Sequence, residues 1–343
     1  MATDTSGTEI PGTQGRPGTP TQLSYVTLDV FTSTRYTGNP LAIIRVPQHV
    51  VLSQSQKQRI AREFNLSESV FLHEQMQHDR HDQSVRIDIF TAYAEVPFAG
   101  HPTVGTANYL LRLLQDDGLN GVKALQVKAG RFGISLNPAV SGVQISVAHD
   151  LHIHASPFAD TPFAHHPVVS IVKGMTFILA QLPDLHSLAA QSHNLVGADA
   201  TYTAKDGLDQ GWRDGIVVSY FYVDLGTTTT TTTATTTPSD ADRKGHQDVP
   251  VRSLRTRSLG SREDPATGSA ASALTSYLAL QEGKPGRYRY VLTQGVEMGQ
   301  RSQIFVEVGV KSRDDGPGVE IAQVLLSGSA VQVTKGSLEV PPA

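Results

Sequence analysis

The sequence predicts an α+β fold with long antiparallel sheets and one prominent helix in each half of the chain. Short β-rich runs alternate with only a few segments of helical periodicity. An internal echo also exists, because Pro102–Ala107 and Pro265–Ala270 share proline, glycine, a hydroxyl residue and alanine in the same register. Each copy opens a helical pattern and follows a polar residue, His101 or Asp264. We therefore expect two pseudo-symmetric domains that each direct a helix N-terminus at a shared cleft.

The first half begins with strands. Tyr25–Phe31 and Leu41–Val46 are rich in β-branched and aromatic residues, and a turn-forming Gly-Asn-Pro segment precedes the second run. Ser53–Phe64 places apolar residues at helical spacing after a serine that can cap a helix. The remaining elements expected in this half are strands over Val70–Leu72 and Val85–Phe90 and a helix over Pro102–Gln115.

The second half repeats this style. A β-branched run covers Val168–Leu182, a buried strand covers Gly215–Val223, and Ala266–Leu280 carries alanine and leucine on one helical face. The last expected strands are Tyr290–Thr293, Ser302–Val310, Val319–Leu326 and Ala330–Val333. We expect an N-terminal domain over residues 25–150 and a C-terminal domain over 151–330, with a last strand near 331–340 that returns to the first domain.

Two segments have low complexity. Residues 1–24 are dominated by threonine, glycine and proline, with almost nothing to bury, and predict a disordered tail. Residues 226–248 contain a threonine run with a charged continuation, and predict a disordered insertion. We expect no chemistry from this insertion, although a scaffold that uses it for contacts is one alternative function.

Composition excludes several kinds of chemistry. The chain has 343 residues, 39% of them hydrophobic and 17% charged, with a net charge of −4. No basic excess exists to bind nucleic acid or anionic lipid, so small molecules or proteins are the expected partners. The absence of cysteine rules out thiolate metal sites, cysteine nucleophiles and racemases that use two thiols. No signal-like or membrane-spanning run is present, so we expect a cytoplasmic protein.

The two glycine-rich helix starts predict an anion site. Their unpaired N–H groups, hydroxyl side chains and positive dipole ends favour a small carboxylated substrate between the domains. Taken singly, Thr103 and Ser269 would be ordinary helix caps. Glu68 lies between a predicted helix and a predicted strand, and alone it would be read as a solvated surface residue.

A local cluster of His149, His152 and His154 also occurs. In a strand, Asp150 would share a face with the last two histidines. Ligands so close on one extended segment rarely complete a coordination shell, and we predict no metal site. The sequence contains no G-x-S-x-G elbow, P-loop or G-x-G-x-x-G segment to indicate a hydrolase, an NTPase or a dinucleotide-binding protein.

Several of these motifs together resemble the PhzF phenazine-biosynthesis-like family. They occur in the family's order, and the resemblance covers roughly Tyr25 to Leu338 apart from the threonine insertion. The combination is specific, although any single motif would not be. The motifs are Asp29–Phe31 with Gly38–Pro40, Asn65–Phe71, Gly100–Gly105, Glu263–Ala270 and Gln294–Gly295.

The resemblance implies a fold and a mechanism. The family has the diaminopimelate-epimerase-like fold, in which each of two pseudo-symmetric domains wraps a mostly antiparallel sheet around a central helix. By residue match Glu68 would be the acid/base of an isomerase that needs no cofactor, with His101 and Asp264 as further catalytic groups. Family members often pair, which implies a homodimer. The residues matched to substrate binding are Asn39, Ser67, Gly100, Thr103, Gly105, Thr267, Gly268 and Ser269.

The sequence departs from the family in one segment. Many members carry an aromatic residue and a proline just before the Glu263-Asp264-Pro265 motif, whereas Arg255–Arg262 has neither. This departure affects the expected cleft wall and substrate. The alternative function is a non-catalytic protein that binds a small molecule in the same cleft.

Overall fold

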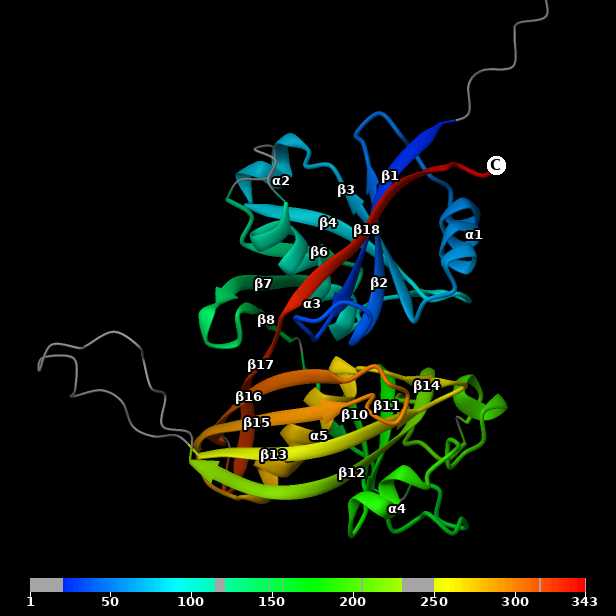
Figure 1. The fold of residues 1–343 in the computed structure, drawn as a ribbon. Helices are drawn as coiled ribbons and strands as arrows, with labels where there is room; N and C mark the ends of the chain where they lie inside the picture. Colours follow the sequence, from blue (N-terminus) through cyan, green and yellow to red (C-terminus); the bar gives the residue numbers. More distant parts are fainter. Residues whose placement is uncertain are drawn as a thin grey trace, which may run out of the picture.

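The computed structural model describes residues 21–114, 121–147, 149–155, 157–204, 206–229, 250–314 and 316–342. These residues form two domains that stand one above the other (Figure 1). None of the helices within the described ranges is long and apolar enough to cross a membrane.

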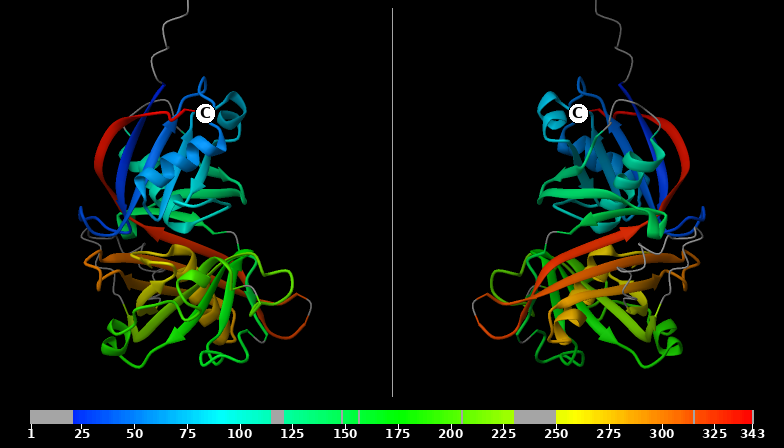
Figure 2. Two further views of the ribbon diagram at one scale, coloured as in Figure 1. Left: turned by 90° about the vertical axis from the view of Figure 1, so that its right-hand side faces the viewer. Right: turned by 90° about the vertical axis from the view of Figure 1, so that its left-hand side faces the viewer.

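The first domain is built from both ends of the chain. Its C-terminal strand lies beside its N-terminal strand on the outside of the domain, as Figure 2 shows. Its elements are β1 (Gln22–Val30), β2 (Asn39–Val46), α1 (Gln54–Phe64), β3 (Glu68–His73), α2 (Gln77–His81), β4 (Ser84–Phe90), β5 (Glu95–Val96), α3 (Gly100–Asn108), a π-helical turn (Tyr109–Leu113), β6 (Ala124–Val127), β7 (Gly130–Asn137), a 3-10 turn η3 (Pro138–Val140), β8 (Gly142–Ser146) and β18 (Ala330–Glu339).

The second domain holds the remaining elements. They are β9 (His152–Ile153), β10 (Val168–Val172), β11 (Gly174–Gln181), α4 (Leu185–Ala189), the 3-10 turn η4 (Asp199–Tyr202), β12 (Gly215–Thr229), β13 (Pro250–Leu259), β14 (Glu263–Asp264), α5 (Gly268–Gln281), β15 (Gly286–Gln294), β16 (Ser302–Ser312) and β17 (Val319–Gly328).

Both domains use the same strand pairing. In the first, β1 pairs antiparallel with β2, β2 parallel with β3, β3 antiparallel with β4, β4 parallel with β6, and β6–β7 and β7–β8 antiparallel. In the second, β10, β11, β12, β13, β15, β16 and β17 repeat this order and these directions. The ladder β8–β17 joins the two sheets. The predicted α+β fold of two pseudo-symmetric domains is confirmed.

Each sheet wraps around one central helix. All nine residues of α3 are buried, and α5 is buried at nearly every position. Glycine, alanine, serine and threonine dominate both helices, because only small side chains leave room for a sheet on several sides of a helix. The helix α5 contacts β10, β11, β15, β16 and β17. The central helices thus fix where the two domains direct their helix N-termini.

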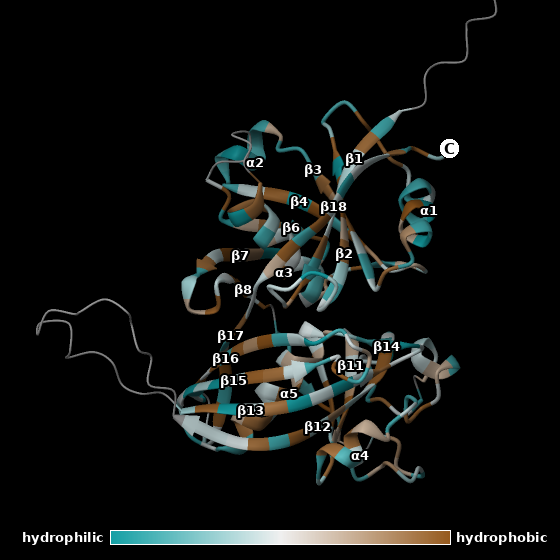
Figure 3. Cartoon of the chain, viewed as in Figure 1, coloured by the Kyte–Doolittle hydropathy of each residue, from teal (hydrophilic) through white to brown (hydrophobic). Residues whose placement is uncertain are grey.

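Helix α1 covers the outside of the first domain. The Ser53 hydroxyl accepts the Gln56 N–H at 3.2 Å while the Gln56 side chain accepts the Ser53 N–H at 2.9 Å, which completes a capping box. Asn65 ends the helix in the left-handed conformation, with φ 49°. Figure 3 shows hydrophilic and hydrophobic positions on this helix, as expected for one side packed on the sheet.

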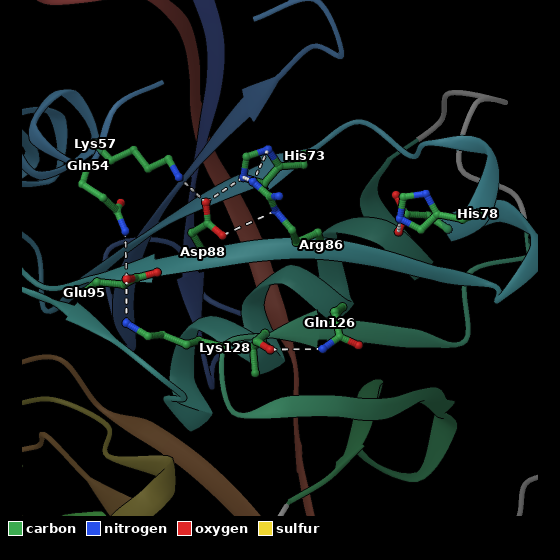
Figure 4. A network of polar contacts seen from close by, with 11 residues as sticks. Gln54, Lys57, His73, His78, Arg86, Asp88, Glu95, Gln126 and Lys128 are labelled. Atoms are coloured by element: carbon green, nitrogen blue, oxygen red, sulfur yellow. Dashed lines mark hydrogen bonds and ion pairs between the residues drawn. The ribbon is translucent and has the colours of Figure 1, made fainter. Parts of the chain in front are cut away.

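A network of charged side chains attaches α1 to β4 (Figure 4). The Lys57 ammonium and the His73 ring both lie within hydrogen-bond distance of one oxygen of Asp88. Arg86 approaches the other oxygen at 3.6 Å. Burial acts to raise the pKa of Asp88, but hydrogen bonds and charges from His73 and Lys57 outweigh it and hold the pKa well below its usual range.

Two expected boundaries need correction. Strand β1 begins at Gln22, so the end of the expected tail over residues 1–24 lies in a sheet. Strand β12 runs to Thr229, inside the expected insertion over 226–248, because β-branched threonines pair with residues 250–252 of β13. The run Val168–Leu182 contains two strands, since Gly174 turns the chain with φ 88°. Residues 1–20 and 230–249 lie outside the described residues.

Candidate active site

A cleft of about 460 Å³ lies between the two domains. Ser67 and Glu68, at the start of β3, line it from the first domain. Asp264 from β14, with Thr267 and Ser269 at the start of α5, line it from the second. Strand ends next to the central helices therefore bring sequence-distant polar side chains to one site.

Glu68 and His101 are hydrogen-bonded to each other. The His101 Nδ1 atom lies 2.8 Å from Glu68 Oε2, and its Nε2 atom lies 3.2 Å from the backbone oxygen of Asn39. Because a carbonyl oxygen only accepts, Nε2 must carry a proton and donate it. The second proton lies between Nδ1 and Oε2, on either the histidine or the carboxyl. His101 is 3% exposed and Glu68 19%, so the carboxyl is the member that faces the cleft.

Asp264 is held by groups from both domains. Its Oδ1 accepts hydrogen bonds from Asn39 Nδ2 at 2.8 Å and from Ser67 Oγ at 2.9 Å, and its Oδ2 accepts from Thr267 Oγ1 at 2.6 Å. Burial raises the pKa of Asp264, and the negative charge of Glu68 adds to the rise, against the hydrogen bonds from Thr267 and Ser67 and the charge of His101. The Asp264 carboxyl therefore ionises less readily than an ordinary aspartate.

Gln294 holds Asp264 and Thr267 in place through hydrogen bonds. The sequence alone did not indicate this role. Its Nε2 atom donates to the Asp264 backbone oxygen at 2.7 Å and to Thr267 Oγ1 at 3.1 Å. Its Oε1 atom accepts from the Tyr220 hydroxyl at 2.9 Å and from the Thr267 N–H at 3.3 Å. The residue is fully buried. Its only sequence signal is membership of the Gln294–Gly295 motif.

Ser269 offers a hydroxyl donor in the cleft. Ser269 is 3% exposed and lines the cleft. The N-cap of α5 is Thr267, whose side chain makes no cap hydrogen bond and instead bonds Asp264. Neither Ser269 nor Thr267 is an ordinary helix cap. Their hydroxyls line the cleft together with Glu68 and Asp264, and we call these four residues the polar floor of the cleft.

Two expected substrate contacts are corrected. The Thr103 hydroxyl donates to the Ala99 oxygen at 2.7 Å and is fully buried, so it bonds its own helix rather than the cleft. Gly105 lies inside α3, where a β-carbon would lie 2.4 Å from Leu41 Cδ2. Its role is close packing in the core. Neither residue lines the cleft.

Three further residues matched to substrate binding are Asn39, Gly100 and Gly268. Asn39 is fully buried, and its Nδ2 atom donates a hydrogen bond to Asp264 Oδ1. Gly100 and Gly268 contact each other at the first turns of α3 and α5. The sequence echo had matched Gly105 with Gly268, but the helix starts match Gly100 with Gly268.

The arginines before the Glu263-Asp264-Pro265 motif have separate roles. Arg255 pairs with Glu297 at 2.7 Å. Arg257 is buried, pairs with Glu263 and donates to backbone oxygens near α4. Only Arg262 of the three lines the cleft, and its Nη1 atom donates to the Asn65 oxygen of the first domain at 3.2 Å.

One group among the described residues has metal-ligand geometry. Ligand atoms of His152, His154 and Asp209 lie within 4.8 Å of one another. Each already has a protein partner: His152 Nε2 donates to Asp209 Oδ2 at 2.8 Å, and the Asp209 N–H donates to His154 Nδ1 at 3.1 Å. Burial lowers the pKa of His154 to about 4, and the charge of His152 adds to this effect against that of Asp209. Asp209, rather than the expected Asp150, joins the histidines.

Known proteins share this architecture. A hydroxyproline epimerase of Agrobacterium vitis, solved with bound trans-4-hydroxy-L-proline, matches with a TM-score of 0.58 at 13% identity over 93% of each chain. A PhzF family protein of Bacillus anthracis matches with a TM-score of 0.61 at 19% identity, over 93% of this chain and 99% of that one. The fold is therefore that of the two-domain epimerases and racemases.

The sequence comparisons are more specific. The phenazine biosynthesis-like protein family matches residues 28–195 and 224–336, and the chain belongs to this family, as its motifs predict. An uncharacterized isomerase of Mesorhizobium japonicum is 29% identical over 92% of this chain and 98% of its own. The trans-2,3-dihydro-3-hydroxyanthranilate isomerase of Pseudomonas aeruginosa is 28% identical over 91% and 98%. The predicted enzyme class agrees with these names.

Proposed function

We propose that this protein is an isomerase that moves a proton on a small carboxylated metabolite, with Glu68 as the acid/base group. One observation carries the proposal: the Glu68 carboxyl faces the interdomain cleft and is hydrogen-bonded to a buried histidine that can exchange a proton with it. The isomerases among its relatives support the reaction class.

The proton transfer balances without a cofactor. The Glu68 carboxylate takes a proton from carbon, and the electron pair of the broken C–H bond moves into an adjacent unsaturated or carboxyl group. The proton then returns to another carbon on the same face, so the substrate is neither oxidised nor reduced. The hydrogen bond between Glu68 and His101 can stabilise either protonation state of the base.

Asp264 and the start of α5 supply binding and acid groups. A raised pKa keeps the Asp264 carboxyl protonated to higher pH, so it can donate a hydrogen bond to a substrate oxygen. The Ser269 hydroxyl and the positive helix end suit a substrate carboxylate. Inversion at carbon would need a second acid on the opposite face, and Asp264 comes from the opposite domain.

Deuterium exchange tests the proposal. Wild-type protein in D₂O should remove a carbon-bound proton signal, read by proton NMR, from one member of a carboxylic acid set. The set begins with trans-2,3-dihydro-3-hydroxyanthranilate and trans-4-hydroxy-L-proline. We expect Glu68→Gln to bind the same acid but to exchange at least about 100-fold more slowly.

Glu74→Gln is the matched control, since Glu74 directly follows the far end of the same strand and accepts a backbone hydrogen bond there. It should exchange at the wild-type rate. Full exchange by Glu68→Gln would remove Glu68 from the mechanism. Binding without exchange by the wild type would favour the non-catalytic alternative.

A further inference from the structure

The cleft extends well beyond the polar floor. Glu68, Asp264 and Ser269 are polar lining residues, but both domains also contribute apolar residues to the lining. Apolar walls in a binding cleft favour ligands with matching apolar surface. The wall residues include Ala92, Val96 and Phe98 from the first domain and Met175, Phe177 and Ile216 from the second.

Two tyrosines meet across this part of the cleft. Tyr93 comes from the loop between β4 and β5, and Tyr202 is the last residue of η4 in the other domain. Their ring centroids lie 6.3 Å apart with an interplanar angle of 67°, an edge-to-face arrangement. Both line the cleft, yet Tyr93 is 70% and Tyr202 42% exposed. Exposed aromatic residues of this kind are typical of binding surfaces.

The two tyrosines line the same cleft as Glu68, the candidate base. Burial raises the pKa of Tyr202, and the charge of Glu68 contributes to the rise, against a hydrogen bond with Ser261. The two rings line the same cleft as Ser269 and Glu68, so the remaining atoms of a ligand held at Ser269 and Glu68 can contact them. A compact polar acid would leave these rings and the apolar walls without contacts.

We propose that this cleft selects carboxylic acids with a bulky apolar body, and that Tyr93 and Tyr202 are the residues that determine this specificity. The inference rests on the proposed function for the orientation of the carboxylate. The cleft volume of about 460 Å³ accommodates such a body, and the rings offer faces and edges for an aromatic or cyclic group.

A pair of non-reacting probes tests the inference on the full chain. Propanoate and 3-phenylpropanoate carry the same carboxylate but differ by one ring. By titration calorimetry we expect 3-phenylpropanoate to bind at least about tenfold more tightly. Tyr93→Ala and Tyr202→Ala should each weaken its binding about tenfold and leave propanoate unchanged, while Tyr202→Phe should keep the preference.

Tyr36→Ala is the control, because Tyr36 is 81% exposed and lies outside the cleft. It should not alter either affinity. Equal affinity for the two probes, or an unchanged preference in both alanine variants, would overturn the inference. The Glu68→Gln variant distinguishes a failure of this inference from a failure of the proposed function. If only the isomerase proposal fails, the preference for 3-phenylpropanoate and its dependence on the two tyrosines persist. If only the inference fails, deuterium exchange by the wild type persists.

Discussion

Gly100 and Gly268 approach each other so closely that neither has room for a side chain. A β-carbon on Gly100 would lie 3.1 Å from the Gly268 α-carbon and 2.9 Å from Leu326 Cδ2. A β-carbon on Gly268 would meet the same Leu326 atom at 2.8 Å. The first turns of the two central helices can therefore touch only because both positions lack a β-carbon, and this contact joins the domains behind the cleft.

Substitution of Gly100 by alanine should separate these helix starts. Alanine normally favours a helix, but here the added methyl has backbone on one side, so we expect a loss of about 2 kcal/mol in the free energy of unfolding. Urea denaturation measures it. Gly133→Ala in β7 is the control, because a β-carbon there meets nothing within 4 Å. Equal stability of the two variants would contradict a tight contact.

Loss of the Asp88 charge should loosen α1 from β4. The folded-state pKa of Asp88 lies below the unfolded value, so its contribution to stability is complete above about pH 4 and falls as the pH drops further. Asp88→Asn should cost about 3 kcal/mol at pH 7, because Lys57 is left nearly buried without its carboxylate.

The difference from wild type should shrink when urea denaturation is repeated below pH 4. Asp82→Asn, at an exposed position after α2, should behave as wild type at every pH. A loss at pH 7 that is no larger for Asp88→Asn than for this control would show that the network does not stabilise the fold.

His154 should make the second domain sensitive to acid. Its pKa is lowered to about 4 in the folded state, whereas the unfolded chain titrates near 6.5, so stability falls as the pH drops from 6.5 to 4. The fall should reach about 3 kcal/mol. His154→Asn retains an acceptor for the Asp209 N–H and should flatten this part of the stability profile. The exposed His193→Asn should leave it steep.

Ionisation of the buried Asp264 carboxyl should lower the stability of the fold. The pKa of Asp264 is raised in the folded state, so the folded protein loses stability when this carboxyl ionises. The contribution of Asp264 to the free energy of unfolding is therefore complete below about pH 4 and declines as the pH rises. Because asparagine does not titrate, the melting temperature of Asp264→Asn relative to that of wild type should rise between pH 4 and pH 8. A difference between the two melting temperatures that stays constant from pH 4 to pH 8 would contradict the raised pKa.

Local patterns were enough to predict the elements whose causes are local. Ser53 and Gln56 form a capping box within four residues, and the helix begins where the sequence places it. The strand-rich halves and their two central helices were also evident. Strand β13 was not predicted, because it carries Arg255 and Arg257, whose charges are compensated by Glu297 and Glu263 only in the folded sheet.

The family motifs single out three residues that lie together in the structure. Glu68 and Asp264 line one cleft, and His101 lies 2.8 Å from Glu68. The misplaced contacts have a physical reason. Threonine and glycine at helix starts can bind ligands or pack, and only the three-dimensional neighbours decide which, as Ala99 does for Thr103 and Leu41 for Gly105. Tyr93 and Tyr202 carry no motif, because they meet only across two domains.

The pairing of β18 with β1 joins residues as distant as Gln22 and Glu339. During translation, the sheet of the first domain must wait for its edge strand until the entire second domain has been made. A premature stop codon before Ala330 would leave nearly all of the second domain intact but would remove strand β18 from the first domain. Such a truncated chain would expose the β1 edge, and quality-control proteases and aggregation would act on the half that was synthesised first.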